Sequence, residues 1–448
     1  MKRIITLLML ITGALRTFAQ EQPASQTYNF SINDAINYAY THKDSVVNAG
    51  LDVKSADYKV KETIGQGLPQ ISGSAAFQDY LKIPTTLLPG EFFGQPAGTF
   101  IPVKFGVKYQ SNLGVSVNQL LFDPSYIVGL QGRKTYKELY NRAYTRTRID
   151  VGVNVTKAYY QVLVSNEQIK LLDANIAQLK QQLDQTVAQN KQGFVEKIDV
   201  DRITVQYNNL ITTRENTVRL LALNYQLLKF QIGMPIEYNL TLKDGLSDVA
   251  LTDDVANTLT DTTFYRNRIE YGLLETSLKL SKFDLKRQKA QFLPKLSANA
   301  SYAASYQNNN FSNLYSNSFP SSYIGLSLNV PIFSGFQRSN QVKQAAITVQ
   351  KNQNNLSSLK NALSLQASQA KIVYFNGLQS LNNQKRNQEL AREVLRVSKI
   401  KYQQGVGSSI EVTQAQTALE DADNKYIQGL YDALVSKVDL DKAYGKIQ

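Results

Sequence analysis

Four short segments of the chain alternate between apolar and polar residues. The clearest runs from 296 to 307, where leucine, alanine and tyrosine alternate with serine, asparagine and glutamine. The same pattern covers 323–332 and 109–121, and a weaker version covers 71–81, where Asp79 interrupts the apolar face. Because successive side chains of a strand point to opposite faces, the pattern predicts four strands, each apolar on one side and lined with small polar residues on the other.

Much longer segments repeat apolar residues with the spacing of a helix. Between 151 and 190 the seam positions alternate by four and three residues, as in a coiled coil. Seams of the same phase begin at Val200 and at Val412. Helical pattern is nearly unbroken over 124–192 and 336–404, about 69 residues or roughly 100 Å each at 1.5 Å per residue. Helices of that length suit a structure that spans a compartment rather than a compact core.

The two long helical segments end in related turns. Aligned on Gly193 and Gly405, 212 residues apart (405 − 193), both turns have a glutamine before the glycine and an isoleucine and a valine after it. An acid stands in the same column of each, Asp199 in the first and Glu411 in the second. Glycine allows the left-handed backbone that a tight reversal between helices needs. Each turn is therefore predicted to join two antiparallel helices.

The repetition extends through most of the chain. Residues 67–77 match 292–302, and residues 114–126 match 325–337. A repeat of this length indicates two copies of one structural unit. We predict four parts in chain order: a signal peptide at 1–19, a first structural repeat (helix, two barrel strands, two long tunnel helices) at 20–232, an inter-repeat equatorial segment at 233–262, and a second structural repeat at 263–448.

The first 19 residues have the composition of a secretory signal peptide. Lys2 and Arg3 precede an apolar run at 4–15, and the sequence Thr17-Phe18-Ala19 supplies a cleavage site. A run of about 12 apolar residues is too short to span a bilayer, which needs about 20. We therefore expect export, and no later apolar run is long enough to form a transmembrane helix.

Composition narrows the possible chemistry. The chain has no cysteine and one histidine, His42, which excludes disulfides and disfavours a zinc or iron site. The net charge of +13 falls to about +10 (13 − 3) without the signal peptide, and the basic run from Lys279 to Lys289 fits a solvated helix face. We find no nucleic-acid-binding module and no nucleophile elbow, phosphate loop or metal cluster. We expect no cofactor, no nucleic-acid partner and no enzymatic activity.

The predicted strands are typical of a membrane β-barrel, which faces lipid outside and water inside. A soluble sandwich also has alternating strands, but four strands spread over 448 residues make a poor sandwich. Four strands cannot close a barrel, because about eight is the usual minimum. Since an open edge is not tolerated in lipid, several copies of the chain must share one barrel, and three copies would give twelve strands.

This doubled plan resembles the outer-membrane efflux protein family, the TolC-like channels. The resemblance rests on Leu-Pro-x-[Ile/Leu]-Ser at 68–72 and 293–297, on Pro-Ile-Phe-Ser-Gly at 331–335, and on the two tip sequences. It implies a mainly α fold with β structure: a trimeric channel-tunnel in which a 12-stranded outer-membrane β-barrel continues as a 12-helix coiled-coil α-barrel across the periplasm. It also implies a passive exit duct for a tripartite efflux or type I secretion system, with a periplasmic adaptor and an inner-membrane transporter as partners.

The resemblance places the glycine turns at the periplasmic mouth of the duct, where acids repeated by threefold symmetry form carboxylate rings that favour cations. Tyr402 fits the position of a family tyrosine that holds the mouth shut. The family's neighbouring basic position falls on Gly407, and its second acid falls on Gln414, so a less acidic gate is implied. The candidate gate residues are Asp199, Asp201, Tyr402, Glu411 and Gln414, and the candidate adaptor contacts are Gly193, Val195, Gly405 and Val406.

Two alternatives stay open at this stage. Asp199 and Glu411 lie in the first turn of a helix, where an acid is favourable beside the helix dipole without any role in a pore. The whole chain, moreover, could be a soluble periplasmic coiled-coil scaffold or adaptor. That function explains the helices and the export signal, but it does not explain the alternating strands.

Overall fold

The structure, a computed structural model, describes residues 27–246, 251 and 263–447. The predicted signal peptide and part of the predicted inter-repeat segment lie outside the described residues. The chain divides into two compact units. The first comprises Met1–Leu51, Arg142–Gly272 and Ser358–Gln448, and the second comprises Asp52–Asn141 and Leu273–Ser357.

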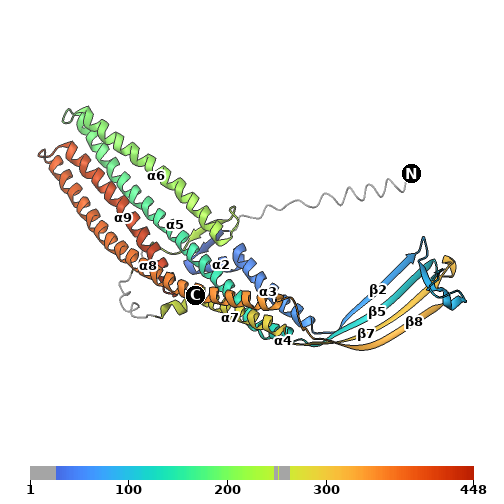
Figure 1. The fold of residues 1–448 in the computed structure, drawn as a ribbon. Coiled ribbons are helices and arrows are strands. Elements are labelled where there is room, and N and C mark those ends of the chain that lie inside the picture. The colour runs from blue at the N-terminus through green and yellow to red at the C-terminus, as the bar shows by residue number, and fades with distance from the viewer. Residues whose placement is uncertain (1–26, 247–250, 252–262, 448) are drawn as a thin grey trace, which may run out of the picture. The chain divides into compact units, whose positions relative to one another are not determined.

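The fold is mainly helical with a smaller share of strands, as predicted. One order of elements, a helix, two long strands and two long helices, occurs twice (Figure 1). The first series is α3 (Asp44–Gly65), β2 (Gln70–Asp79), β5 (Tyr109–Phe122), the short α4 (Pro124–Gln131) followed by α5 (Arg133–Lys191), and α6 (Lys197–Ile232). The second series is α7 (Ile269–Ala290), β7 (Lys295–Asn308), β8 (Ser318–Asn329), α8 (Gln337–Gln403) and α9 (Ser409–Ala443).

The second unit contains an antiparallel four-stranded sheet in the order β2-β5-β7-β8. Its register aligns the predicted apolar faces, because Ile71 lies opposite Val117, Val117 opposite Ala300, and Ala300 opposite Ile324. The apolar face is open, with Ile324 88% exposed and Leu326 72% exposed. Among the described residues β2 and β8 each have one edge without a strand partner. This sheet therefore has both an apolar face and two edges left to cover.

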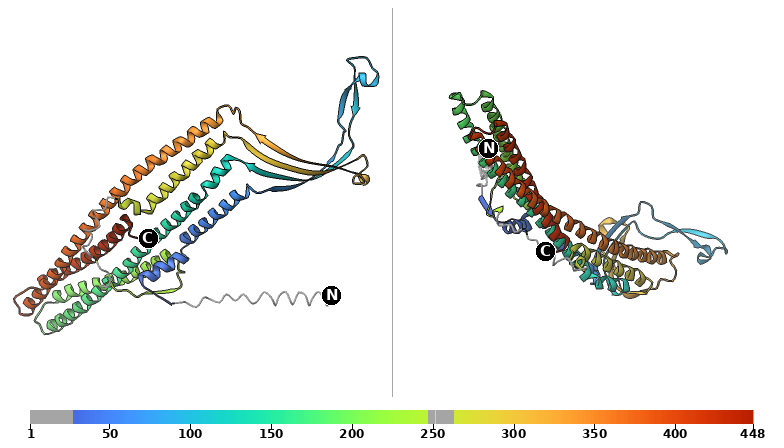
Figure 2. Two further views of the ribbon diagram at one scale, coloured as in Figure 1. Left: turned by 90° about the horizontal axis from the view of Figure 1, so that it is seen from below. Right: turned by 90° about the vertical axis from the view of Figure 1, so that its left-hand side faces the viewer.

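Each strand of the sheet is joined at one end to a helix by a short segment (Figures 1 and 2). At the junction of β5 and α4, Asp123 caps the helix by accepting from the backbone N–H of Ser125 at 2.8 Å, and Pro124 stands at the first helical position. The same carboxylate pairs with Lys295 Nζ at 2.9 Å. This ion pair ties the start of β7 to the neighbouring strand–helix junction.

An additional hairpin lies between β2 and β5, formed by β3 (Thr85–Pro89) and β4 (Phe100–Lys104) with a short 3-10 helix, η2 (Gly90–Phe93), in between. A second 3-10 turn, η6 (Phe311–Asn313), separates β7 from β8. The two strands of this hairpin were not predicted from the sequence pattern.

The first unit contains the ends of two helical hairpins, α5–α6 and α8–α9. The predicted seams are buried between the paired helices. Leu172, Leu179, Ile203 and Leu210 form one apolar cluster, and the seam residues Val412, Ala415 and Leu419 form another with Leu395 of α8. In the described ranges, no helix combines the length and the apolar character required to cross a membrane.

A smaller layer packs beside these helices in the same unit. It consists of α2 (Ile32–His42) and the parallel pair β1 (Thr27–Phe30) and β6 (Asn239–Leu242), and η5 (Phe264–Asn267) follows later in the chain. Ser31 and Asp34 form a capping box at the start of α2. The buried Tyr159 of α5 donates its hydroxyl to Asp244 at 2.9 Å, which attaches the layer to the long helix.

Candidate gate at the two helical tips

The two hairpins reverse direction through the same backbone conformation. Gly193 has φ of +79° and Gly405 has φ of +74°. In each turn the residue after the glycine donates its N–H to the carbonyl five residues earlier, at 3.0 Å in both cases, which is the bond that ends a helix in a left-handed glycine. A Cβ at either glycine would meet nothing within 4 Å. The positive φ alone therefore accounts for glycine at both positions.

The outermost side chains of the tips are apolar and exposed. Val406 is 78% exposed, and Phe194, which occupies the same column in the first turn, is 77% exposed. Val195, by contrast, is half-buried, and its carbonyl accepts from Asn190 Nδ2 at 2.8 Å. Sequence reasoning missed Phe194, although its alignment with Val406 was the available signal.

Asp199 joins the two hairpins. Its carboxylate accepts a hydrogen bond from the hydroxyl of Ser409, the first residue of α9, and pairs with Arg202 Nη1 at 3.3 Å. The Asp199 side chain is only 17% exposed. A second polar link lies deeper, where Gln206 Nε2 donates to the carbonyl of Thr413 at 3.3 Å. The first acid of the repeated pair thus makes a specific contact between α6 and α9.

The second acid has a different environment. The Glu411 side chain is exposed and accepts no hydrogen bond within the described chain, and only its backbone N–H is engaged, donating to Ser408 Oγ at 3.2 Å. Ser408 is the N-cap of α9, as its sequence position indicates. Asp201 and Gln414 are also exposed. Three of the five candidate gate residues therefore present free polar groups to solvent at the tip.

Tyr402 occupies the interior of the second hairpin. Its ring packs against the apolar cluster that contains Leu395 and Val412, and its hydroxyl is buried with no hydrogen-bond partner in the described chain. Burial, with a smaller contribution from the charge of Asp199, raises the pKa of Tyr402 above its usual value. The structure therefore brings Tyr402 near Asp199 without a hydrogen bond between them.

A polar cavity of about 150 Å³ lies beside Tyr402, between α5 and α8. Glutamines of α5 line one wall, and the oxygen Oε1 of Gln182 is buried there without a hydrogen-bond partner in the part of the chain that the structure describes. Lys399 lines the opposite wall, and burial lowers the pKa of its ammonium group to about 8. In the described part of the chain no three His, Cys, Asp or Glu side chains are grouped so as to hold a metal ion.

A third contact between the hairpins lies farther from the tips and was not predicted. The buried Asp423 of α9 accepts from Asn175 Nδ2 of α5 and from Gln388 Nε2 of α8, both at 2.7 Å. One carboxylate thereby connects three helices. An isolated aspartate on a long helix gives no sequence signal of such a role, because most such residues are solvated.

Comparisons with known proteins agree with this architecture. The family model described as "Outer membrane efflux protein" matches residues 275–446. The outer membrane protein TolC of Vibrio cholerae is 20% identical over 344 residues, covering 75% of this chain and 76% of the relative. TolC of Escherichia coli is 22% identical over 367 residues, covering 75% of this chain and 70% of the relative.

Solved structures show the same fold. The structure of CusC has a TM-score of 0.74 at 15% sequence identity and covers 96% of both chains. The outer membrane protein VceC of Vibrio cholerae has a TM-score of 0.70 at 12% identity, covering 92% of this chain and 96% of that chain.

These relatives are channel proteins, so the expectation of a non-enzyme holds at the level of the family. Their descriptions place them in the outer membrane, which agrees with the outer-membrane localisation predicted for this chain. Family model, relatives and fold agree: residues 275–446 match the outer membrane efflux protein family, and the chain as a whole is similar to the TolC outer membrane proteins and has the fold of the outer-membrane channels.

Proposed function

We propose that the protein is the passive outer-membrane exit duct of a tripartite efflux or type I secretion system, which conducts substrates from an inner-membrane transporter to the exterior. The observation that carries the proposal is the four-stranded sheet with an exposed apolar face and two unpaired edges, continued by long helical hairpins. An apolar face is stable against lipid, and a sheet within the lipid bilayer must have all its edge strands paired.

A homotrimer satisfies both requirements. Three copies would close a barrel of twelve strands (3 × 4) and an α-barrel of twelve long helices (3 × 4), with β2 of one copy beside β8 of the next. The two series of elements would then be structural repeats at 20–232 and 263–448, joined by the equatorial segment 233–262. The predicted signal peptide at 1–19 is consistent with export to this location.

The periplasmic tips would form the gate. Asp199 would act as an intrachain latch, since it is engaged by Ser409 and Arg202. Glu411, Asp201 and Gln414 would line the mouth, with the two acids forming rings, because their side chains are exposed. The adaptor would contact the tips at Gly193, Val195, Gly405 and Val406. Phe194 joins this candidate surface because its side chain is exposed.

Single-channel conductance of the purified protein in a planar bilayer tests the duct and its gate together. We expect small, cation-selective steps. Glu411→Ala should reduce the selectivity while leaving the opening frequency unchanged, and Asp199→Ala should increase the opening frequency. Large unselective openings in all three proteins would keep the duct and remove these acids from the gate, whereas folded protein without any channel activity would contradict the duct.

The periplasmic scaffold or adaptor remains the second candidate. It requires the apolar face of the sheet to be covered by something other than lipid. Extraction separates the two functions: a duct should fractionate with the outer membrane and require detergent, whereas a scaffold should be released by salt or remain with the inner membrane.

A further inference from the structure

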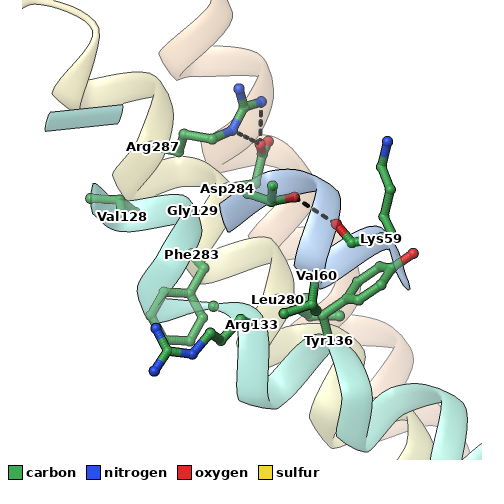
Figure 3. Close-up of a pocket in the computed structure, with 12 residues that line it drawn as sticks. Lys59, Val60, Val128, Gly129, Arg133, Tyr136, Leu280, Phe283, Asp284 and Arg287 are labelled. Atoms are coloured by element: carbon green, nitrogen blue, oxygen red, sulfur yellow. Dashed lines mark hydrogen bonds and ion pairs between the residues drawn. The ribbon is translucent and has the colours of Figure 1, made fainter. Parts of the chain in front are cut away.

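A cavity of about 300 Å³ opens among α3, the α4–α5 segment and α7 of the second unit (Figure 3). Val60 of α3, Val128 of α4, and Leu280 and Phe283 of α7 give it a mainly apolar lining. The volume is within the range of small-molecule sites. The function of the duct, as argued above, makes no use of this cavity.

Two glycines keep the cavity empty of protein side chains. A Cβ at Gly129 would meet nothing within 4 Å, so a side chain there would extend into free space. A Cβ at Gly132 would touch the ring of Phe283 at 3.6 Å. Both glycines lie in helical backbone without positive φ, so turn geometry does not explain them. Their effect is to leave room beside the apolar residues.

The rim of the cavity is cationic. Lys59, Arg133 and Arg287 line it, against a single acid, Asp284. Arg287 is held by Asp284 at 2.8 Å, and Lys59 pairs with Glu62 at 2.8 Å. Arg133 is exposed and makes no hydrogen bond or ion pair with any described residue. An apolar lining with an unengaged guanidinium at its edge complements an apolar chain that ends in an anionic group.

The distance from the sheet indicates where such a molecule comes from. Arg133 lies 11 residues (133 − 122) beyond the end of β5, which is roughly 16 Å at 1.5 Å per residue. The headgroup layer of a bilayer adds only about 5–8 Å on each side. A lipid that stays in the membrane cannot place its phosphate that far beyond the headgroup layer, so the bound molecule comes from the aqueous phase. This choice of source rests on the proposed function, whereas the cavity and its charges do not.

We propose that this cavity binds a single-chain anionic amphiphile from the aqueous phase, such as a fatty-acid carboxylate. The apolar chain lies along Val60, Val128, Leu280 and Phe283, and the anionic head pairs with Arg133. Binding of this kind connects three helices that otherwise meet around a gap.

Photoaffinity labelling tests the site on the full-length protein in bilayer discs. The probe is a twelve-carbon fatty acid with a diazirine at the end of its chain, and the neutral probe is the corresponding alcohol. We expect saturable labelling by the acid on α4 and α7, located by mass spectrometry of the peptides. The alcohol should label about tenfold less, because it cannot form a charged pair with the guanidinium.

Two variants and two matched controls define the site. Gly129→Leu fills the cavity and should reduce labelling about tenfold or more, and Arg133→Gln should reduce labelling by the acid about fivefold without changing labelling by the alcohol. Ala346→Leu and Lys351→Gln make comparable changes of bulk and charge at exposed positions on α8, and should label as the unaltered protein does.

Several results would overturn the proposal. Unchanged labelling in Gly129→Leu would show that the cavity is not the site, and equal labelling by acid and alcohol would remove the role of Arg133. Labelling by phosphatidylglycerol that carries the same diazirine chain, but not by the free acid, would contradict the aqueous source. Gly129→Leu should still form channels; loss of labelling with channels retained separates this site from the duct, whereas absence of channels in the unaltered protein would instead contradict the proposed function.

Discussion

The two helical tips share their backbone and differ in their side-chain contacts. Both reverse at a glycine with positive φ and close with the same hydrogen bond. Asp199 at the first tip is engaged by the other hairpin, whereas Glu411, its counterpart, extends into solvent. Asn190, in the column of Tyr402, bonds the backbone of its own turn, while Tyr402 fills an apolar core.

The comparison shows that both repeats keep the turn, whereas the acid contacts the other hairpin in only one repeat. A turn depends on one glycine and on local backbone bonds, so both repeats retain it. A contact between hairpins needs only one residue of each repeated pair, which frees the other. The same holds away from the tips, where Asp423 connects three helices while its counterpart 212 residues earlier is Ile211.

The largest effect is expected at Asp423. Asp423→Ala leaves the buried amides of Asn175 and Gln388 without their acceptor, at an expected cost of about 2–4 kcal/mol of unfolding free energy. Denaturant unfolding of the purified protein measures it. Asp421→Ala is the matched control, because Asp421 is exposed and forms only a surface pair with Lys425; equal losses in both variants would contradict the role of Asp423 as a connection between helices.

The two acids at the tips should also differ in how much each stabilises the protein, but by less than Asp423 differs from its control. Asp199→Ala removes the acceptor of Ser409 and the partner of Arg202, and should cost roughly 1–2 kcal/mol. Glu411→Ala should stay within about 0.5 kcal/mol, as for other exposed positions. The hydrogen-exchange rates of the backbone amides at 405–412 report the local change, and these rates should increase only in Asp199→Ala. Equal exchange in the two variants would remove the contrast between the tips.

The turn glycines should respond alike. Gly193→Ala and Gly405→Ala each force a Cβ into left-handed backbone, which costs roughly 1–2 kcal/mol, and nothing nearby adds a clash. Thermal unfolding measures both. Gly65→Ala, where no positive φ occurs and no atom is within 4 Å, is the control without strain, and a large difference between the two tips would show that their backbones are not equivalent.

Tyr402 should have the smallest effect near neutral pH. Tyr402→Phe removes a buried hydroxyl that has no hydrogen-bond partner among the described residues, so stability at pH 7 should be unchanged or slightly higher. Because the pKa of Tyr402 is raised by folding, the unfolded chain loses this proton first as pH rises above 10, and the stability contribution declines through the folded pKa. In denaturant titrations at pH 9–11, Tyr402→Phe should therefore lose less unfolding free energy with rising pH than the unaltered protein. Parallel pH dependences of the two proteins would contradict this expectation.

The sequence pattern predicted the elements better than the contacts between them. Period-two alternation identified all four strands of the sheet, and their register matches the predicted faces because a one-residue slip would reverse every side chain. The seam from 151 to 190 is buried or half-buried throughout. The role of Asp423 could not be predicted, since it depends on amides 248 and 35 residues away. For Asp199, the pattern alone favoured a helix cap and the family resemblance favoured a pore ring, and the contact with Ser409 was not predicted.

The unpaired edges of the sheet affect how a newly synthesised chain behaves before it assembles. The edge strand β8 contains no charged residue, and β2 contains only Asp79 at its end. Proteins usually protect such edges with charge or with a covering segment, because a bare edge recruits any other extended chain. On the proposed trimer, a protomer that has not yet assembled is thus prone to aggregation, and the yield of folded protein depends on how soon it meets other copies. Slow expression, which lowers the concentration of waiting protomers, should favour assembled protein over aggregates.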